Sequence, residues 1–188
     1  LPPLHRAADA AQPHSTSIKA ACESRVFEVM RDAFTLRYEL IPYIYASTRR
    51  TYDEGVSLCR PLYWEWPECD EAYARTGQYL FGDQLMVCPV TRAASRVSKA
   101  AGIDVWVPPG RWTAWHTGHT YEGPRMIRML VPLDEIPIFA REGAIVPGVP
   151  QSRRSGSGAP DPLLLHVFPG QEGSIRHYED DGVSEGYR

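Results

Sequence analysis

The sequence predicts an α+β chain in which a helical segment is followed by an antiparallel β-sandwich or a closed β-barrel. From Val26 to about Tyr52, apolar residues recur every three to four positions, which is the period of an amphipathic helix. Beyond Gly55 the period changes, and Pro and Gly recur at short intervals between short apolar or alternating runs. That punctuation is typical of short antiparallel strands. The 188 residues are enough for one domain or two small ones.

The expected helix has a start, a break and an end that single residues define. Ser24 is a candidate N-cap. Pro42 cannot donate a backbone hydrogen bond, so it should kink or split the helix. Gly55 should end it, because glycine readily adopts the left-handed conformation of a helix C-terminus. The apolar face comprises Val26, Met30, Ala33, Phe34, Leu40, Ile41 and Ile44.

Short strands are expected throughout the segment that follows. The predicted strands are Leu80–Phe81, Leu85–Val90, Ile103–Val107, Arg111–His116, Met126–Pro132 and Ile136–Phe139. Pro108-Pro109-Gly110 is expected to form a tight turn between two of them. Farther on, Leu163–Phe168 is predicted as a strand with Ser174–Tyr178 as its hairpin partner. Between these regions, residues 149–161 have the Pro, Gly and Ser content of a linker.

Composition and charge exclude several classes of partner. The net charge is −3, and the basic pairs Arg49-Arg50 and Arg153-Arg154 are interpreted as a solvated helix end and a solvated loop. We therefore expect no nucleic-acid partner. No apolar run approaches the length of about 20 residues that a membrane helix needs, so no membrane partner is expected. The sequence assigns no cellular compartment.

Cysteine and histidine spacing predicts no metal centre and no cofactor. The four cysteines lack a C-x-x-C pair and are expected to be buried free thiols; they are Cys22, Cys59, Cys69 and Cys88. His116 and His119 could share a metal ion only on a helix. Their Trp-His-Thr-Gly-His-Thr context favours a hairpin turn.

Aromatic residues leave two interpretations open. Exposed rings stack on sugars, so a carbohydrate-binding surface is conceivable, whereas buried rings would fill the core. We favour the core for the tryptophans, which are Trp64, Trp66, Trp106, Trp112 and Trp115.

An ordered series of motifs resembles the C-terminal part of glycoside hydrolase family 31, which comprises retaining α-glucosidases, α-xylosidases and related transglycosylases. The resemblance covers Val26–Pro147 and extends to parts of 165–182. The motifs are Leu-Arg-Tyr-Glu-Leu-Ile-Pro-Tyr-Ile-Tyr (36–45), Cys-Arg-Pro-Leu (59–62), Tyr-Leu-Phe-Gly-Asp (79–83), Leu-Asp-Glu-Ile-Pro-Ile-Phe-Ala-Arg-Glu-Gly-Ala-Ile-Val-Pro (133–147) and Tyr-Glu-Asp-Asp-Gly (178–182).

The resemblance implies a domain plan. Residues 1–55 would hold an irregular N-terminal segment and the last helix of a (β/α)8 barrel. Residues 56–148 would form a proximal C-terminal β-sandwich, and 149–161 a linker. Residues 162–188 would begin a distal β domain that is truncated here.

The resemblance also implies that the catalytic aspartate pair of the family lies upstream of these motifs. A retaining glycosidase needs two carboxyl groups about 5–5.5 Å apart across a cleft. The carboxylates of this chain are Glu135, Glu142 and the run Glu179-Asp180-Asp181. We interpret that run as a turn capped by Asp side chains, with weak calcium binding as the alternative. We therefore predict no catalytic, cofactor-binding or metal-binding residue in this chain, and whether it is itself an enzyme stays open.

Three functional hypotheses follow. The first is a structural segment of a retaining α-glycosidase, whose oligosaccharide substrate would bind through the barrel. The second is a stand-alone carbohydrate-binding module, and the third is a degenerate product. In each case, an exposed apolar helix face would favour self-association.

Overall fold

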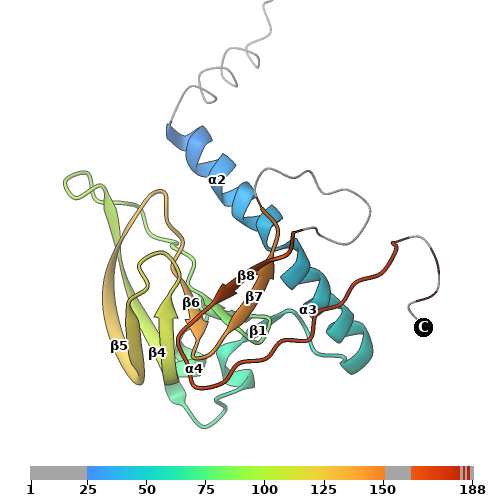
Figure 1. Cartoon of the computed structure of the whole chain (residues 1–188). Helices are drawn as coiled ribbons and strands as arrows, with labels where there is room; N and C mark the ends of the chain where they lie inside the picture. Colours follow the sequence, from blue (N-terminus) through green and yellow to red (C-terminus); the bar gives the residue numbers. More distant parts are fainter. Residues whose placement is uncertain (1–24, 151–161, 183, 185, 187–188) are drawn as a thin grey trace, which may run out of the picture. The chain divides into compact units, whose positions relative to one another are not determined.

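The computed structural model describes residues 25–150, 162–182, 184 and 186 (Figure 1). The chain divides into two compact units, residues 1–35 and 36–188, which are described separately. Three sequence predictions, those for Ser24, Cys22 and Arg153-Arg154, lie outside the described residues, as does most of the expected linker.

Two helices replace the single helix of the sequence pattern, because Pro42 splits it as predicted. Helix α2 spans Arg25–Glu39 and helix α3 spans Ile41–Glu54. Pro42 lies in the first turn of α3, where its missing N–H is not needed. Gly55 then ends α3 with φ +70° and donates its N–H to the Thr51 carbonyl at 3.0 Å, as predicted.

A six-stranded antiparallel sheet forms the larger part of the second unit. Its order is β1-β2-β3-β6-β4-β5, and a separate two-stranded sheet pairs β7 with β8. The strands are β1 Cys59–Pro61, β2 Tyr79–Phe81, β3 Leu85–Val87, β4 Ala100–Ala114, β5 Thr120–Pro132, β6 Ile138–Arg141, β7 Ile145–Gly148 and β8 Leu164–Val167. Between β1 and β2 lie a short 3-10 helix η1, Leu62–Trp64, and helix α4, Asp70–Ala74.

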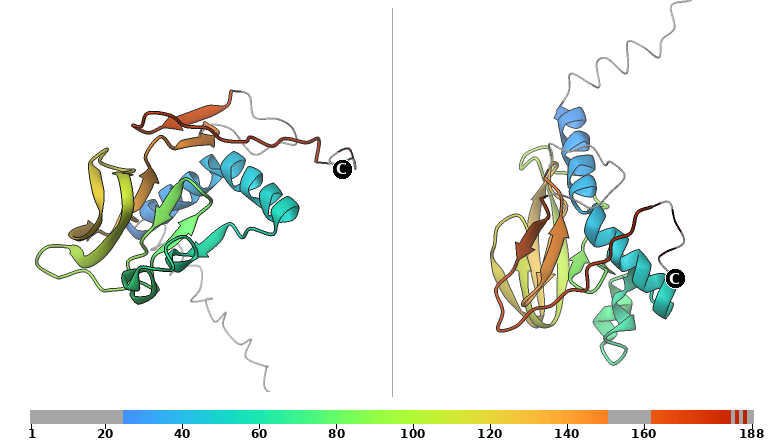
Figure 2. Two further views of the ribbon diagram at one scale, coloured as in Figure 1. Left: turned by 90° about the horizontal axis from the view of Figure 1, so that it is seen from below. Right: turned by 45° about the vertical axis from the view of Figure 1, so that its right-hand side comes forward.

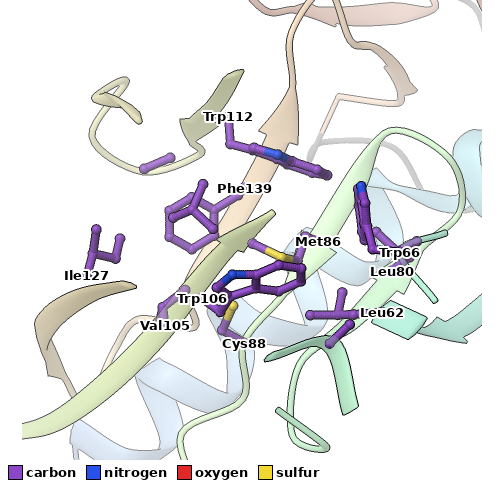
Figure 3. Close-up of a cluster of buried hydrophobic side chains, with 13 residues drawn as sticks. Leu62, Trp66, Leu80, Met86, Cys88, Val105, Trp106, Trp112, Ile127 and Phe139 are labelled. Atoms are coloured by element: carbon purple, nitrogen blue, oxygen red, sulfur yellow. The ribbon is translucent and has the colours of Figure 1, made fainter. Parts of the chain in front are cut away.

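Alternation along the short central strands gives the sheet two buried faces. Leu80, Met86 and Phe139 contribute to one core, which also contains Leu62, Trp66, Trp106 and Trp112 (Figure 3). Their neighbours Leu85, Val87, Ile138 and Ala140 point into a second core with Leu40, Tyr43 and Val146. Helix α3 and strand β7 therefore cover one face of the sheet, while η1, α4 and the long β4–β5 hairpin enclose the other.

Two predictions about strand connections were wrong. Pro108-Pro109-Gly110 does not turn the chain but lies within β4, where the register against β5 shifts between Val107 and Gly110. Gly123 permits this bulge, because a Cβ there would lie 1.9 Å from the Pro108 carbonyl oxygen. Residues 174–178 are not a strand; β8 instead pairs antiparallel with β7.

The structure confirms a mixed fold of helices and antiparallel sheet. The hairpin turn predicted around His116 and His119 is also present. It joins β4 directly to β5, which pair antiparallel. The proposed domain boundaries remain predictions.

Candidate functional site

Tyr43 of α3 is the centre of a joint between the helix and the sheet. Its side chain is 1% exposed, and its phenol donates to the Phe81 carbonyl at 2.7 Å and accepts from the Gln84 N–H at 3.1 Å. Burial raises the pKa of the Tyr43 phenol, so the hydroxyl stays protonated and able to donate. Gly82, at φ +62°, lets the β2–β3 turn lie directly against Tyr43, because a Cβ at this position would be 2.2 Å from the Tyr43 hydroxyl oxygen.

Asp83 joins the same turn to both neighbouring elements. It accepts from Arg60 of β1 at 2.8 Å and pairs with Arg50 of α3. The Arg60 side chain is only 5% exposed and also donates to the carbonyls of Ser57 and Gly82, at 2.9 and 3.1 Å. A buried guanidinium needs such partners, because removing its charge from water is costly.

The ion pairs continue from Arg60 through Glu65 to the sheet. Glu65 lies 3.6 Å from Arg60 and also accepts from Arg141 of β6. The Arg141 guanidinium lies 5.6 Å from the centre of the Trp66 ring and 5.1 Å from that of Trp112. We call this series the ion-pair chain; its members are Arg50, Asp83, Arg60, Glu65 and Arg141. It connects helix α3 to the tryptophan-rich core.

The sequence did not predict the ion-pair chain. Arg49 and Arg50 lie near the end of α3 with partly exposed side chains, in agreement with a solvated helix end; Arg49 pairs with Asp53 at 2.8 Å, and Arg50 pairs with Glu54 and also with Asp83. The signal that sequence reasoning missed is Arg60, which stands among apolar residues in β1. An arginine buried at such a position requires an acidic partner elsewhere in the fold.

The carboxylate run near the C-terminus forms the predicted Asp-capped turn. Asp180 accepts from the hydroxyls of Tyr45 and Tyr178, each at 2.7 Å, and from the Gly182 N–H at 2.9 Å. The hydrogen bond from Tyr178, followed by that from Tyr45, lowers the pKa of Asp180. The same carboxylate raises the pKa of Tyr45 to about 12. This turn therefore fastens the C-terminal segment to α3 (Figure 2).

A groove of about 450 Å³ lies between α3, the β2–β3 turn and residues 174–178. Its acidic groups are engaged: Asp53 pairs with Arg49, while Glu54 and Asp83 pair with Arg50. The groove is thus lined by paired charges of both signs.

Two of the other carboxylates considered from the sequence have local partners. Glu142 pairs with Arg111 at 3.1 Å, and Glu179 contacts His177 at 2.6 Å. Glu135 lies in the exposed turn before β6. No hydrogen bond or ion pair joins any two of these groups among the described residues.

The two histidines of the hairpin turn have separate surroundings. His116 Nε2 lies 3.2 Å from the Ile136 carbonyl oxygen, whereas the His119 ring packs edge-on against Tyr121. In the part of the chain that the structure describes, no three His, Cys, Asp or Glu residues are arranged to hold a metal ion. Within those same residues, no helix is long and apolar enough to cross a membrane.

The structure decides most of the aromatic and cysteine predictions. Trp66, Trp106 and Trp112 are buried as predicted, but Trp64 is 61% exposed. Of the described cysteines, all free thiols, Cys88 is buried, whereas Cys59 is exposed, which contradicts its predicted burial.

Comparison with known proteins shows to which protein family the sequence is similar. A family model described as the glycosyl hydrolase family 31 C-terminal domain matches residues 55–146. An α-xylosidase of Saccharolobus solfataricus is 35% identical over 161 residues, which are 85% of this chain and 21% of the relative. Human neutral alpha-glucosidase AB is 33% identical over 167 residues, 86% of this chain and 17% of the relative.

Solved structures agree with these sequence matches. A dextranase of this family from Flavobacterium johnsoniae, complexed with isomaltotriose, superposes with a TM-score of 0.77 at 32% identity, over 87% of this chain and 20% of that one. The family 31 α-xylosidase of Xanthomonas citri superposes with a TM-score of 0.75 at 33% identity. The match covers 88% of this chain and 18% of that one. The chain thus spans about a fifth of the length of these proteins.

Proposed function

We propose, from the premise that this chain belongs to glycoside hydrolase family 31 as its C-terminal part, that it is a structural segment of a retaining α-glycosidase. In this role it braces the last helix of a catalytic (β/α)8 barrel and takes no direct part in hydrolysis of the O-glycosyl bond. The oligosaccharide substrate binds to the barrel, and the aspartate pair of the family supplies the chemistry there.

The joint around Tyr43 carries this proposal. A helix that must keep its place against a barrel needs anchors that tolerate little movement. Tyr43 and the ion-pair chain provide hydrogen bonds from α3 to the β2–β3 turn and onward to β1 and β6. The motifs at 36–45, 59–62 and 79–83 contain Tyr43, Arg60 and Asp83, and the motif at 133–147 contains Arg141. These contacts are a physical reason for those four residues.

The apolar residues of α2 fit the same role. Val26, Phe27, Met30 and Phe34 are 42–57% exposed. Full burial is worth about 1.5–3 kcal/mol for each such side chain, and about half of each is already covered, so covering the rest of all four would contribute about 3–6 kcal/mol as an upper limit. We propose that barrel strands provide this cover in the complete enzyme.

The remaining parts of the domain plan are also proposals. We assign residues 56–148 to a proximal β-sandwich and residues 162–188 to the start of a distal β domain, with 149–161 as the linker. The pairing of β8 with β7 would then tie the start of the distal domain to the end of the proximal one.

An activity assay tests the proposal directly. The chain should not hydrolyse p-nitrophenyl α-glucoside or α-xyloside above the rate of a heat-denatured control. An antibody against residues 55–146 should detect, in the native source, a polypeptide several times larger than 21.1 kDa that does hydrolyse one of these substrates. Turnover by the 188-residue chain would contradict the assignment, and so would a native polypeptide of this length.

Self-association through α2 is expected for the chain alone. Its exposed apolar residues should associate with other copies, because contiguous apolar patches rarely stay uncovered. Size-exclusion chromatography with light scattering should show oligomers, and a variant carrying Met30→Glu and Phe34→Glu should elute as a monomer. A monodisperse monomer for the unsubstituted chain would refute this expectation.

A further inference from the structure

We propose that residues 169–182 form a strap that is anchored at one end and detachable at the other, so that its tip swings away from α3 while the sheets stay folded. The strap reaches α3 (Figure 2), and none of its residues belongs to a helix or a strand. We divide it into a root at 169–173, a span at 174–177 and a tip at 178–182. The inference concerns contacts within residues 36–188 and does not depend on the proposed function.

The root of the strap is fixed by direct backbone contact with the turn between β6 and β7. Gly143 of that turn donates its N–H to the Pro169 carbonyl at 2.9 Å. A Cβ on Gly170 would lie 2.3 Å from the Gly143 nitrogen, and a Cβ on Gly173 would lie 1.9 Å from the Gly143 carbonyl oxygen. Backbones this close pack as tightly as a protein interior, so the root stays with the sheet when the rest of the strap moves.

The span of the strap has few contacts with the elements beside it. The groove of about 450 Å³ lies between the span, α3 and the β2–β3 turn. Ile175 packs against the second core but is only partly buried, and the Ser174 carbonyl accepts from the exposed Gln84 amide at 3.4 Å. A segment with little buried apolar surface and exposed hydrogen bonds opens at a low cost in free energy.

The tip of the strap is held on α3 through one carboxylate. Asp180 accepts from the hydroxyl of Tyr45, on α3, and from that of Tyr178, in the tip, each at 2.7 Å. The two tyrosine rings lie 5.4 Å apart, and the Arg49 guanidinium of α3 lies 5.0 Å from the centre of the Tyr178 ring. The bond from Tyr45 is exposed to solvent, where water competes for both groups. Asp180 is the acceptor shared by helix and tip, so its loss should free the tip.

A fixed root and a weakly held tip place a hinge between residues 173 and 174. Opening about this hinge breaks no strand pair, because the strap takes part in none. It removes one wall of the groove and exposes Ser47 and Arg50 of α3, which line the groove. The strap therefore determines whether this face of α3 is covered.

Replacing Asp180 by asparagine tests the hold of the tip. Asparagine keeps the size of the side chain but removes the charge that strengthens both hydrogen bonds. Trypsin cleavage after Arg176, an exposed residue of the span, should become about tenfold faster, because cleavage requires the opened strap. All variants are made in the Met30→Glu, Phe34→Glu background, which is expected to be monomeric.

Proton NOEs between aromatic rings distinguish opening at the hinge from unfolding of the whole segment. The NOE between Tyr45 and Tyr178 reports the tip, and it should be present in the unsubstituted strap and lost in Asp180→Asn. The rings of Trp115 and Phe168 lie 5.3 Å apart, and Phe168 directly precedes the root. The NOE between these two rings should remain in both proteins.

Glu179→Gln is the matched control, because the Glu179 carboxylate contacts His177 at 2.6 Å within the strap. It should be cleaved at the unsubstituted rate, whereas Tyr45→Phe, which removes only the donor on α3, should be cleaved about threefold faster. Equal rates for Asp180→Asn and Glu179→Gln would overturn the inference, as would loss of both NOEs together. Absence of the Tyr45–Tyr178 NOE from the unsubstituted strap would overturn it as well. None of these outcomes affects the proposed function, which is tested by the native polypeptide and its turnover.

Discussion

Replacing Arg60 by alanine should destabilise the chain far more than replacing Arg50, although both arginines pair with Asp83. The Arg60 side chain is 5% exposed and has two acidic neighbours, Asp83 and Glu65. The Arg50 side chain is 39% exposed, so water screens its charge. Both substitutions remove a guanidinium group from Asp83, but the Arg60 group is buried and also donates to two backbone carbonyls, whereas the Arg50 group is partly exposed.

The magnitudes follow from that difference. Removing one partner of a buried ion pair costs about 3–5 kcal/mol, because the other charge is left uncompensated. Here Asp83 keeps Arg50 and Glu65 keeps Arg141, so we expect about 2–3 kcal/mol of lost unfolding free energy for Arg60→Ala, below the general range. For Arg50→Ala we expect at most about 1 kcal/mol, as for exposed pairs.

Urea unfolding followed by tryptophan fluorescence measures both values, since Trp66 and Trp112 lie next to Arg141 at the end of the ion-pair chain. The Arg60 variant should unfold at clearly lower urea with an unchanged slope. Equal midpoints for the two variants would refute the reasoning, because burial would then not determine the strength of these pairs. A smaller loss for Arg60→Met than for Arg60→Ala would show how much the aliphatic stem contributes by packing.

Three further predictions concern single positions. Gly82→Ala should lower the free energy of unfolding by about 3 kcal/mol, because it combines a positive φ with a clash against the buried Tyr43 phenol. Gly118→Ala, at φ +68° in open space, should cost only about 1 kcal/mol in the same urea unfolding measurements. Gln78→Met should cost about 2–3 kcal/mol and expose the Trp106 amide to hydrogen exchange, because the Gln78 side chain bonds both the N–H and the carbonyl of Trp106, at 2.9 and 2.8 Å. The pKa of Asp180 is lowered in the folded chain, so its contribution to stability is present above the unfolded pKa near 3.8 and is lost as pH falls through the folded value. The side-chain carboxyl NMR signal of Asp180 should therefore show its titration step only below about pH 4; a step of that signal near pH 6 would contradict this.

Much of the local structure could be predicted from neighbouring residues. Pro42 cannot donate a hydrogen bond, so the helix had to break near it, and Gly55 adopts the left-handed conformation that ends α3. The turn at 179–182 followed from Asp side chains that bond backbone N–H groups close in the chain. Each of these outcomes depends on groups within about four residues of one another.

Pairing between distant segments could not be predicted in the same way. Pro108-Pro109-Gly110 has the composition of a turn, yet the extended hairpin of β4 with β5 absorbs it as a bulge. Residues 174–178 have the pattern of a strand, but β8 takes its hydrogen bonds from β7 instead. Local propensity is weak compared with the ladder of bonds and the burial that a competing partner offers.

The sequence by itself determined where the helical segment breaks and ends and to which family the chain belongs, because these depend on short-range order and on a series of motifs. Only the tertiary structure decided that Arg50, Asp83, Arg60, Glu65 and Arg141 meet in one series. The physical reason is distance along the chain: Arg141 and Glu65 are 76 residues apart, and their contact forms only when β6 has entered the sheet between β3 and β4.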